Sequence, residues 1–387
     1  MSATAPASEK PIDRAGLHFD TLAAHATIAD SSTGALTPPI HLSTTFARDE
    51  QGKLVGDYIY SRSNNPNRVM LEHCLAELEG GEVGIAFASG SAATLAVLQC
   101  LDPGDHVIAP ASCYYAVREQ LLTIFSRWGL HFTFVDMSRL DMLEQALARP
   151  TKLVWIETPS NPLITVTDIA AAAALAHGAG ARVLADNSWA TPALQRPLWL
   201  GADFVLHSTT KYLGGHHDVT GGAIIARESE PLVDRLRSLQ DLGGAVPSPF
   251  DCWLVLRGIR TLPIRMRAHS AAARSLADFV AGHPKVSMVH YPGLPSDPGH
   301  AIAARQMADF GGVLSIRVRG GREAALDVAG RVRLFRRATS LAGPESLVEH
   351  RASVEPPGSG TPDDLLRLSV GLENEADLIA DLERALG

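Results

Sequence analysis

The residues Ser208, Thr209, Thr210 and Lys211 form the chemically most informative run of this sequence. The run follows an apolar segment over 204–206 and precedes a glycine-rich turn. A lysine withdrawn from water has a lowered pKa, and its neutral amine can form a Schiff base with an aldehyde. The hydroxyl groups before it suit a phosphate. A lysine that snorkels at the end of a strand explains this segment equally well.

Composition restricts the classes of protein to be considered. A chain of 387 residues is long enough for two domains, and its formal net charge of -8 offers no basic surface for nucleic acid or anionic membranes. No apolar run approaches the roughly 20 residues that span a bilayer, and residues 1–16 lack the apolar stretch of a signal peptide. The four cysteines show neither metal-ligand nor disulfide spacing. We therefore expect a cytoplasmic globular protein with reduced thiols.

The elements that must position Lys211 alternate between helix and strand. Apolar patterns predict strands over residues 84–88, 107–109, 153–156, 182–185 and 204–206, and helices over 68–79, 92–101 and 120–128. Short strands that are apolar on both faces indicate a mostly parallel sheet covered by helices, which is an α/β fold. A long helix over 264–280, strands over 313–318 and 367–370 and a closing helix over 377–386 indicate a second domain. We predict an N-terminal arm over 1–62, a large domain over 63–255 and a small domain over 256–387.

Polar residues follow each predicted strand of the large domain. Ligands of open α/β sheets bind beyond the carboxyl ends of the strands, so these residues form one candidate site. In chain order they are the segment 89–91 (Ser-Gly-Ser), Tyr114, Asn161, Asp186 and Lys211. Each alone has an ordinary interpretation as a helix cap, a core aromatic or a turn. Together they offer phosphate donors, a ring stacker, a polar ligand, an acid for a pyridine nitrogen and an amine, which predicts pyridoxal 5'-phosphate (PLP) as cofactor.

The sequences of these segments and their order along the chain resemble the Cys/Met-metabolism family of PLP enzymes. This family includes cystathionine γ-synthase, cystathionine β- and γ-lyases, methionine γ-lyase and O-acylhomoserine sulfhydrylases. The resemblance runs from Pro38 to the last helix. The segments that carry it are 60–62 (Tyr-Ser-Arg), 88–92 (Ala-Ser-Gly-Ser-Ala), 157–162 (Glu-Thr-Pro-Ser-Asn-Pro), 185–187 (Ala-Asp-Asn), 208–216 (Ser-Thr-Thr-Lys-Tyr-Leu-Gly-Gly-His) and 367–371 (Arg-Leu-Ser-Val-Gly).

The resemblance implies a fold of the aminotransferase type (fold type I) and a role for each matched residue. Lys211 would hold the cofactor and move protons, Asp186 would pair with the pyridine nitrogen, and Tyr114 would stack on the ring. Arg367 and Ser340 would bind the substrate α-carboxylate, for which a guanidinium is the natural bidentate partner. The remaining implied ligands are Gly90, Ser91, Ser208 and Thr210 for the phosphate, Tyr60 and Arg62 from a neighbouring subunit, and Asn161 for the cofactor oxygen or the substrate.

The resemblance also implies a homotetramer, arranged as a dimer of dimers with shared active sites. His216, His217 and Asp218 do not have the spacing of a metal site, so no metal is expected. The family usually has a serine at the position of His217.

The member of the family is predicted from differences at the substrate end. Thr339 stands where synthases and γ-lyases often carry a glutamate, and Ala116 where methionine γ-lyases carry a cysteine. Glu119 replaces a basic residue typical of γ-synthases, and the segment 349–362 is shorter than usual. These differences favour a lyase that eliminates a β- or γ-substituent from cystathionine or a related amino acid. We expect the neutral Thr339 to face the distal part of the substrate, which favours a tolerant site.

Four alternatives remain open. The enzyme could be a γ-replacement enzyme of the cystathionine γ-synthase or O-acylhomoserine sulfhydrylase type. It could also expel a non-sulfur group, such as the oxyguanidine of canavanine. An aminotransferase and a catalytically inactive PLP scaffold are alternatives from other classes, and both are disfavoured by the motifs.

Overall fold

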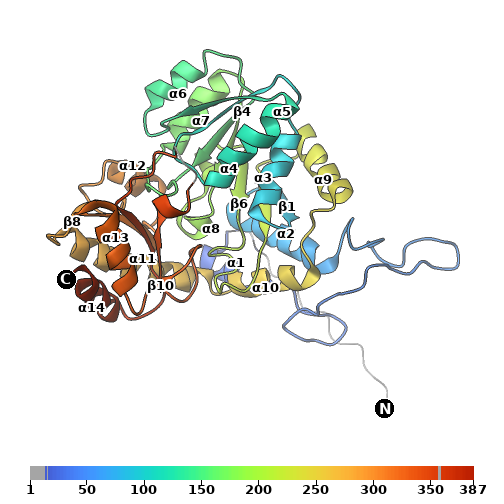
Figure 1. Ribbon diagram of the computed structural model, residues 1–387. Helices are drawn as coiled ribbons and strands as arrows, with labels where there is room; N and C mark the ends of the chain where they lie inside the picture. The colour runs from blue at the N-terminus through green and yellow to red at the C-terminus, as the bar shows by residue number, and fades with distance from the viewer. Residues whose placement is uncertain (1–13, 15, 356–358) are drawn as a thin grey trace.

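The computed structural model describes residues 14, 16–355 and 359–387. Its larger part is built on a seven-stranded sheet with the strand order β1-β7-β6-β5-β4-β2-β3 (Figure 1). Strand β7 runs antiparallel to both of its neighbours, β1 and β6, and the other neighbouring strands of this sheet pair in parallel. The strands are β1 (Val83–Phe87), β2 (His106–Pro110), β3 (His131–Val135), β4 (Leu153–Glu157), β5 (Arg182–Asp186), β6 (Phe204–His207) and β7 (Gly222–Ala226).

Helices cover both faces of this sheet because successive strand residues point to opposite sides. Ile85 packs in one core cluster with residues of α3 (Gly90–Gln99) and α9 (Pro231–Gly243). Its neighbour Ala86 packs in another cluster with residues of α2 (Pro66–Glu79) and α10 (Pro249–Ile259). The β4–β5 end of that second face is covered by α6 (Leu140–Ala146) and α7 (Ile169–Gly178).

The smaller part contains a five-stranded sheet of order β10-β11-β12-β9-β8. These strands are β8 (Val286–His290), β9 (Val313–Val318), β10 (Arg336–Arg337), β11 (Leu347–His350) and β12 (Leu365–Ser369). Its core includes residues of α13 (Gly321–Arg331) and α14 (Glu375–Leu386). The long helix α11 (Leu262–Ala281) joins the two parts, since its first turns pack in the large core and its later turns pack in the small one.

The predicted strands of the large sheet are all present, and the predicted helices 68–79, 264–280 and 377–386 correspond to α2, α11 and α14. The sequence reading missed β3, β7 and several helices. The predicted helix 120–128 is instead a π-helical segment (Gln120–Phe125) followed by α5 (Ser126–Trp128), and α4 (Tyr115–Glu119) directly precedes them. The predicted helix 92–101 begins two residues earlier, at Gly90, because the Ser89 hydroxyl caps it by accepting from the Ala92 N–H.

The predicted arm 1–62 contains one short helix and a long irregular segment; residues 1–13 and 15 lie outside the described residues. Helix α1 (Phe19–Ala24) packs against α2 and α11 through Leu22 and Ala23. The following segment extends away from the two sheets (Figure 1) and exposes apolar side chains, namely Ile28, Leu36, Leu42 and Val55, each at least 68% accessible. Among the described residues, no helix is long and apolar enough to cross a membrane.

The remaining connections are α8 (Thr191–Leu194), α12 (His300–Gln306) and two short 3-10 turns, Pro197–Leu200 and Arg351–Ser353. The last of these turns directly follows β11 and brings Arg351 to the junction of the two parts. The predicted domain boundaries at 62/63 and 255/256 stay predictions, and α10 crosses the second of them.

Candidate active site

A cavity of about 280 Å³ lies at the carboxyl ends of the large-sheet strands, close to the lower end of the size range of small-molecule sites. It brings together most of the residues singled out in the sequence. Those that line it are Gly90, Ser91, Tyr114, Asn161, Asp186, Ser208, Thr210, Lys211, Thr339, Ser340 and Arg367.

One end of the cavity is formed by the first turn of α3. Ser89 caps this ten-residue helix by accepting from the Ala92 N–H, and the remaining free N–H groups of the first turn could bind an anion. A Cβ on Gly90 would lie 3.0 Å from the Cβ of Ser208, so a larger residue would require Ser208 to shift by a few tenths of an ångström. The Thr210 hydroxyl accepts from the Gly221 N–H at 3.0 Å, which fixes its side chain at the same end. This combination of backbone donors and hydroxyls suits a phosphate group.

Lys211 lies on the floor of the cavity. Burial, helped by the nearby Arg367 charge, lowers the pKa of its amine to about 8. Its Nζ donates to the Ser340 hydroxyl at 2.8 Å. Ser340 has φ +100°, an uncommon conformation for a residue with a Cβ, and such strain clusters at functional sites. Lys211 is therefore a positioned amine with a sizeable neutral fraction near neutral pH.

Asp186 and Tyr114 line the same cavity as Lys211. The Asp186 carboxylate at the end of β5 accepts from the Ser188 N–H at 2.9 Å, and burial raises its pKa. A pyridinium nitrogen next to it would favour the ionised carboxylate. Burial also raises the pKa of the Tyr114 phenol to about 12, so the phenol is neutral. The backbone donors, hydroxyls, amine, acid and aromatic ring together fit PLP.

Glu157 supports two of these residues, a role that the sequence reading missed. Its two carboxylate oxygens accept from the backbone N–H of Tyr114 at 2.7 Å and of Asn161 at 2.8 Å. Burial and the neighbouring Asp186 raise its pKa to about 8. Its position at the end of β4, four residues before the predicted ligand Asn161, was the available signal.

Arg367 forms the opposite end of the cavity. One Nη donates to the Asn161 side-chain oxygen at 2.9 Å, and the other donates to the Ser340 carbonyl at 2.9 Å and to Glu349 at 2.7 Å. Arg367 on β12 stands directly opposite Glu349 on β11 in the antiparallel register. These bonds hold the planar fork in one orientation at the cavity wall.

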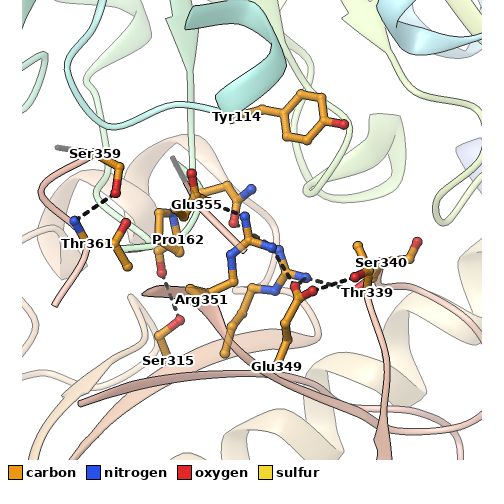
Figure 2. Close-up of polar contacts among 12 residues, drawn as sticks. Tyr114, Pro162, Ser315, Thr339, Ser340, Glu349, Arg351, Glu355, Ser359 and Thr361 are labelled. Atoms are coloured by element: carbon orange, nitrogen blue, oxygen red, sulfur yellow. Dashed lines mark hydrogen bonds and ion pairs between the residues drawn. The ribbon is translucent and has the colours of Figure 1, made fainter. Parts of the chain in front are cut away.

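A second buried arginine, Arg351, adjoins this end and also lines the cavity. Figure 2 shows Arg351 between Glu349 and Glu355, with Tyr114 above these side chains in the view. The Thr339 hydroxyl donates to Glu349 at 2.7 Å. The sequence predicted that Thr339 faces the distal part of the substrate and did not predict this hydrogen bond. The sequence reading noted the shortened segment but missed Glu349, Arg351 and Glu355, since a charged run usually indicates a solvated surface.

Tyr60 and Arg62 do not line this cavity. Tyr60 is 44% exposed, and the Arg62 Nε donates to Asp241 at 3.2 Å at a solvent-accessible surface. His217 also lies outside it, with φ +59° and its ring packed close to Gly343. Among the residues that the structure describes, none of the N-terminal segment lines the cavity of its own chain.

Comparison with known proteins assigns the family. The sequence model of the Cys/Met metabolism PLP-dependent enzymes matches residues 20–387. Cystathionine gamma-synthase of Mycobacterium tuberculosis (strain ATCC 25618 / H37Rv) is 50% identical over 364 residues, which cover 92% of this chain and 94% of the relative. Cystathionine beta-lyase of Coxiella burnetii is 43% identical over 379 residues, which cover 95% and 98%.

A solved structure has the same architecture. Cystathionine gamma synthase from Xanthomonas oryzae pv. oryzae, in complex with cystathionine, superposes with a TM-score of 0.93 at 42% identity and covers 96% of this chain and 98% of that one. This likeness confirms the α/β fold of type I PLP enzymes. The chain belongs to the Cys/Met metabolism family of PLP-dependent enzymes, and its cofactor is pyridoxal 5'-phosphate.

Proposed function

We propose that this enzyme eliminates the substituent on Cβ or Cγ of cystathionine or a related sulfur amino acid or homoserine derivative. The observation that carries the proposal is the placement of Lys211, with its lowered pKa, in one cavity with Asp186 and Arg367. When bound, PLP supplies an electron sink that stabilises negative charge at the substrate Cα.

The side chains of the chain perform the remaining tasks. Arg367, oriented by Asn161 and Ser340, holds the substrate α-carboxylate and thereby fixes Cα near Lys211. The neutral amine of Lys211 would remove the Cα proton, and loss of a γ-substituent would require a base to remove a second proton, at Cβ. Tyr114 lines the same cavity, would stack on the cofactor ring and, as a neutral phenol, could donate a proton to the departing group. Asp186 keeps the pyridine nitrogen protonated.

The names of the relatives support a second candidate, γ-replacement. A γ-synthase and a γ-lyase both expel a γ-substituent, and they differ in whether a thiol then adds. The relatives carry the names of γ-synthase and β-lyase at 50% and 43% identity, so both reactions are tested together.

The experiment is an identification of products from the purified holoenzyme. We expect pyruvate from cystathionine if the β-substituent leaves and 2-oxobutanoate if the γ-substituent leaves. Cystathionine formed from an O-acylhomoserine and cysteine would establish γ-replacement, and homoserine from canavanine a non-sulfur leaving group. A 2-oxo acid with an intact side chain would show transamination, and no product with any of these substrates would contradict the proposal.

The N-terminal segment supports a proposal about assembly. Tyr60 and Arg62 do not line the cavity of their own chain, and the segment around them exposes apolar side chains. We infer a homotetramer, a dimer of dimers, in which these two residues bind the cofactor phosphate of a neighbouring subunit. The four buried free cysteines support a reducing compartment, and we propose the cytoplasm.

A further inference from the structure

The substrate end of the cavity contains a second guanidinium for which the proposed function has no use. Arg351 is 3% exposed and lines the same cavity as Lys211 and Arg367. Its two Nη atoms donate to carboxylates, one to Glu349 at 2.5 Å and the other to Glu355 (Figure 2). Burial alone would lower the pKa of Arg351, but Glu349 and Glu355 raise it above its usual value. The side chain is thus a permanently charged, buried group beside the substrate.

Glu349 is shared between the two arginines. Its Oε2 accepts from Arg367 at 2.7 Å and from Arg351 at 2.5 Å, and its Oε1 accepts from the Thr339 hydroxyl. A buried carboxylate paired with Arg367 alone would cancel the positive charge that must attract the substrate carboxylate. Arg351 binds the same oxygen of Glu349 and therefore weakens the neutralisation of Arg367 by this carboxylate.

We infer that Arg351 is a positioning residue that keeps Arg367 available for the substrate α-carboxylate by competing for Glu349. Glu355 holds Arg351 in place from its other side. The inference rests on the proposed role of Arg367. It predicts opposite effects for the two charges, since loss of Arg351 weakens the carboxylate site and loss of the Glu349 charge strengthens it.

The test measures binding of L-alanine to the holoenzyme through the change in cofactor absorbance. Alanine has an α-carboxylate but no group on Cβ to eliminate, so the reading reports binding and does not depend on turnover. L-alaninamide, which lacks the carboxylate, serves as the reference ligand. Because Arg351→Gln alone leaves two buried carboxylates short of a partner, the variant of choice is R351Q/E355Q, which replaces the ion pair by two amides.

We expect R351Q/E355Q to raise the alanine dissociation constant about tenfold, and Glu349→Gln to lower it about tenfold, the effect of one charge-assisted contact. Alaninamide binding should be equal in all variants. The matched control is Arg322→Gln. Arg322 contacts Ser353 in the same turn and Asp363, but it is 47% exposed, and its loss should leave both ligands unaffected.

Weaker alanine binding in both R351Q/E355Q and E349Q would show a merely structural cluster and overturn the inference. Equal binding in R351Q/E355Q and the parent protein would overturn it as well. Arg367→Gln distinguishes this failure from that of the proposed function: if Arg367→Gln leaves alanine binding unchanged, Arg367 is not the carboxylate site. Normal cofactor content in each variant shows that the fold is retained.

Discussion

The cofactor end of the cavity is built from backbone N–H groups and hydroxyls at the ends of parallel strands, whereas the substrate end is built from buried charged side chains. At the first, the α3 N-terminus, Ser208 and Thr210 surround the place for a phosphate. At the second, Glu349 links Arg367 and Arg351 across the β11–β12 pair. The main-chain arrangement of the fold thus supplies the proposed cofactor site, whereas substrate recognition depends on the balance of charges among Glu349, Arg351 and Arg367, which single substitutions can shift.

Among substitutions at the cofactor end of the cavity, Lys211→Ala should have the largest effect on activity. We expect loss of the borohydride-reducible bond to the cofactor and a fall in kcat of at least about a thousandfold, because the amine both holds PLP and moves the proton. Peptide mapping after reduction measures the attachment site. Lys152→Ala is the control, since Lys152 is exposed and far from the cavity lining. PLP trapped on Lys152 in the parent protein would contradict the assignment.

The cofactor end is also expected to need a second chain. Arg62→Ala and Lys211→Ala should each be inactive, and a mixture after subunit exchange should recover roughly a quarter of the parent activity. Half of random dimers are mixed, and each mixed dimer contains one intact site out of two. Activity assays before and after exchange measure the recovery. Arg48→Ala, also in the N-terminal segment, is the control, and no recovery despite proven exchange would indicate a self-contained site.

Breaking the substrate end has a smaller effect. Arg367→Lys keeps the charge but loses the planar fork and its bonds to Asn161 and Ser340. We expect KM to rise about tenfold to a hundredfold for every amino-acid substrate, with kcat less affected. Steady-state kinetics with two substrates of different side chains measure this. An effect confined to one substrate would place Arg367 near the side chain instead of the α-carboxylate.

These two ends also differ in how far the sequence predicts them. Asp186 and Lys211 follow apolar strands directly, so local patterns place them at one sheet edge. The segment 349–355 contains three charged residues, and its burial depends on the pairing of β11 with β12, which brings Glu349 opposite Arg367. Nothing local indicates this pairing. The same holds for the larger fold, since β7 inserts antiparallel between β1 and β6 and the predicted helix 120–128 includes a π-helical segment.

The lowered pKa of Lys211 couples the two ends of the cavity, because burial and the Arg367 charge both contribute to it. The cofactor-free protein should bind PLP covalently at a rate that rises with pH, reaches half of its plateau near pH 8 and levels off above about pH 9, since only the neutral amine reacts. At pH 7 the rate should be about a tenth of its plateau, whereas an ordinary lysine would show no plateau until about pH 10.4. Stopped-flow absorbance measures the rate. A rate that still rises severalfold between about pH 9 and 10 would show that burial and Arg367 do not lower the pKa.

The smallest expected effect concerns Thr339, which anchors Glu349 from the cavity wall. Thr339→Val keeps the shape of the side chain and removes the hydroxyl that donates to Glu349 at 2.7 Å. Glu349 then loses a neutral donor and interacts more strongly with the two arginines, so Arg367 is less available to the substrate. One hydrogen bond contributes about 1 kcal/mol, so we expect a KM about fivefold higher, with an unchanged cofactor spectrum. Thr339→Ser, which keeps the hydroxyl, is the control and should behave as the parent protein. If valine and serine give the same KM, the hydroxyl has no part in the charge balance, and the specificity of this end rests on the arginines and glutamates alone.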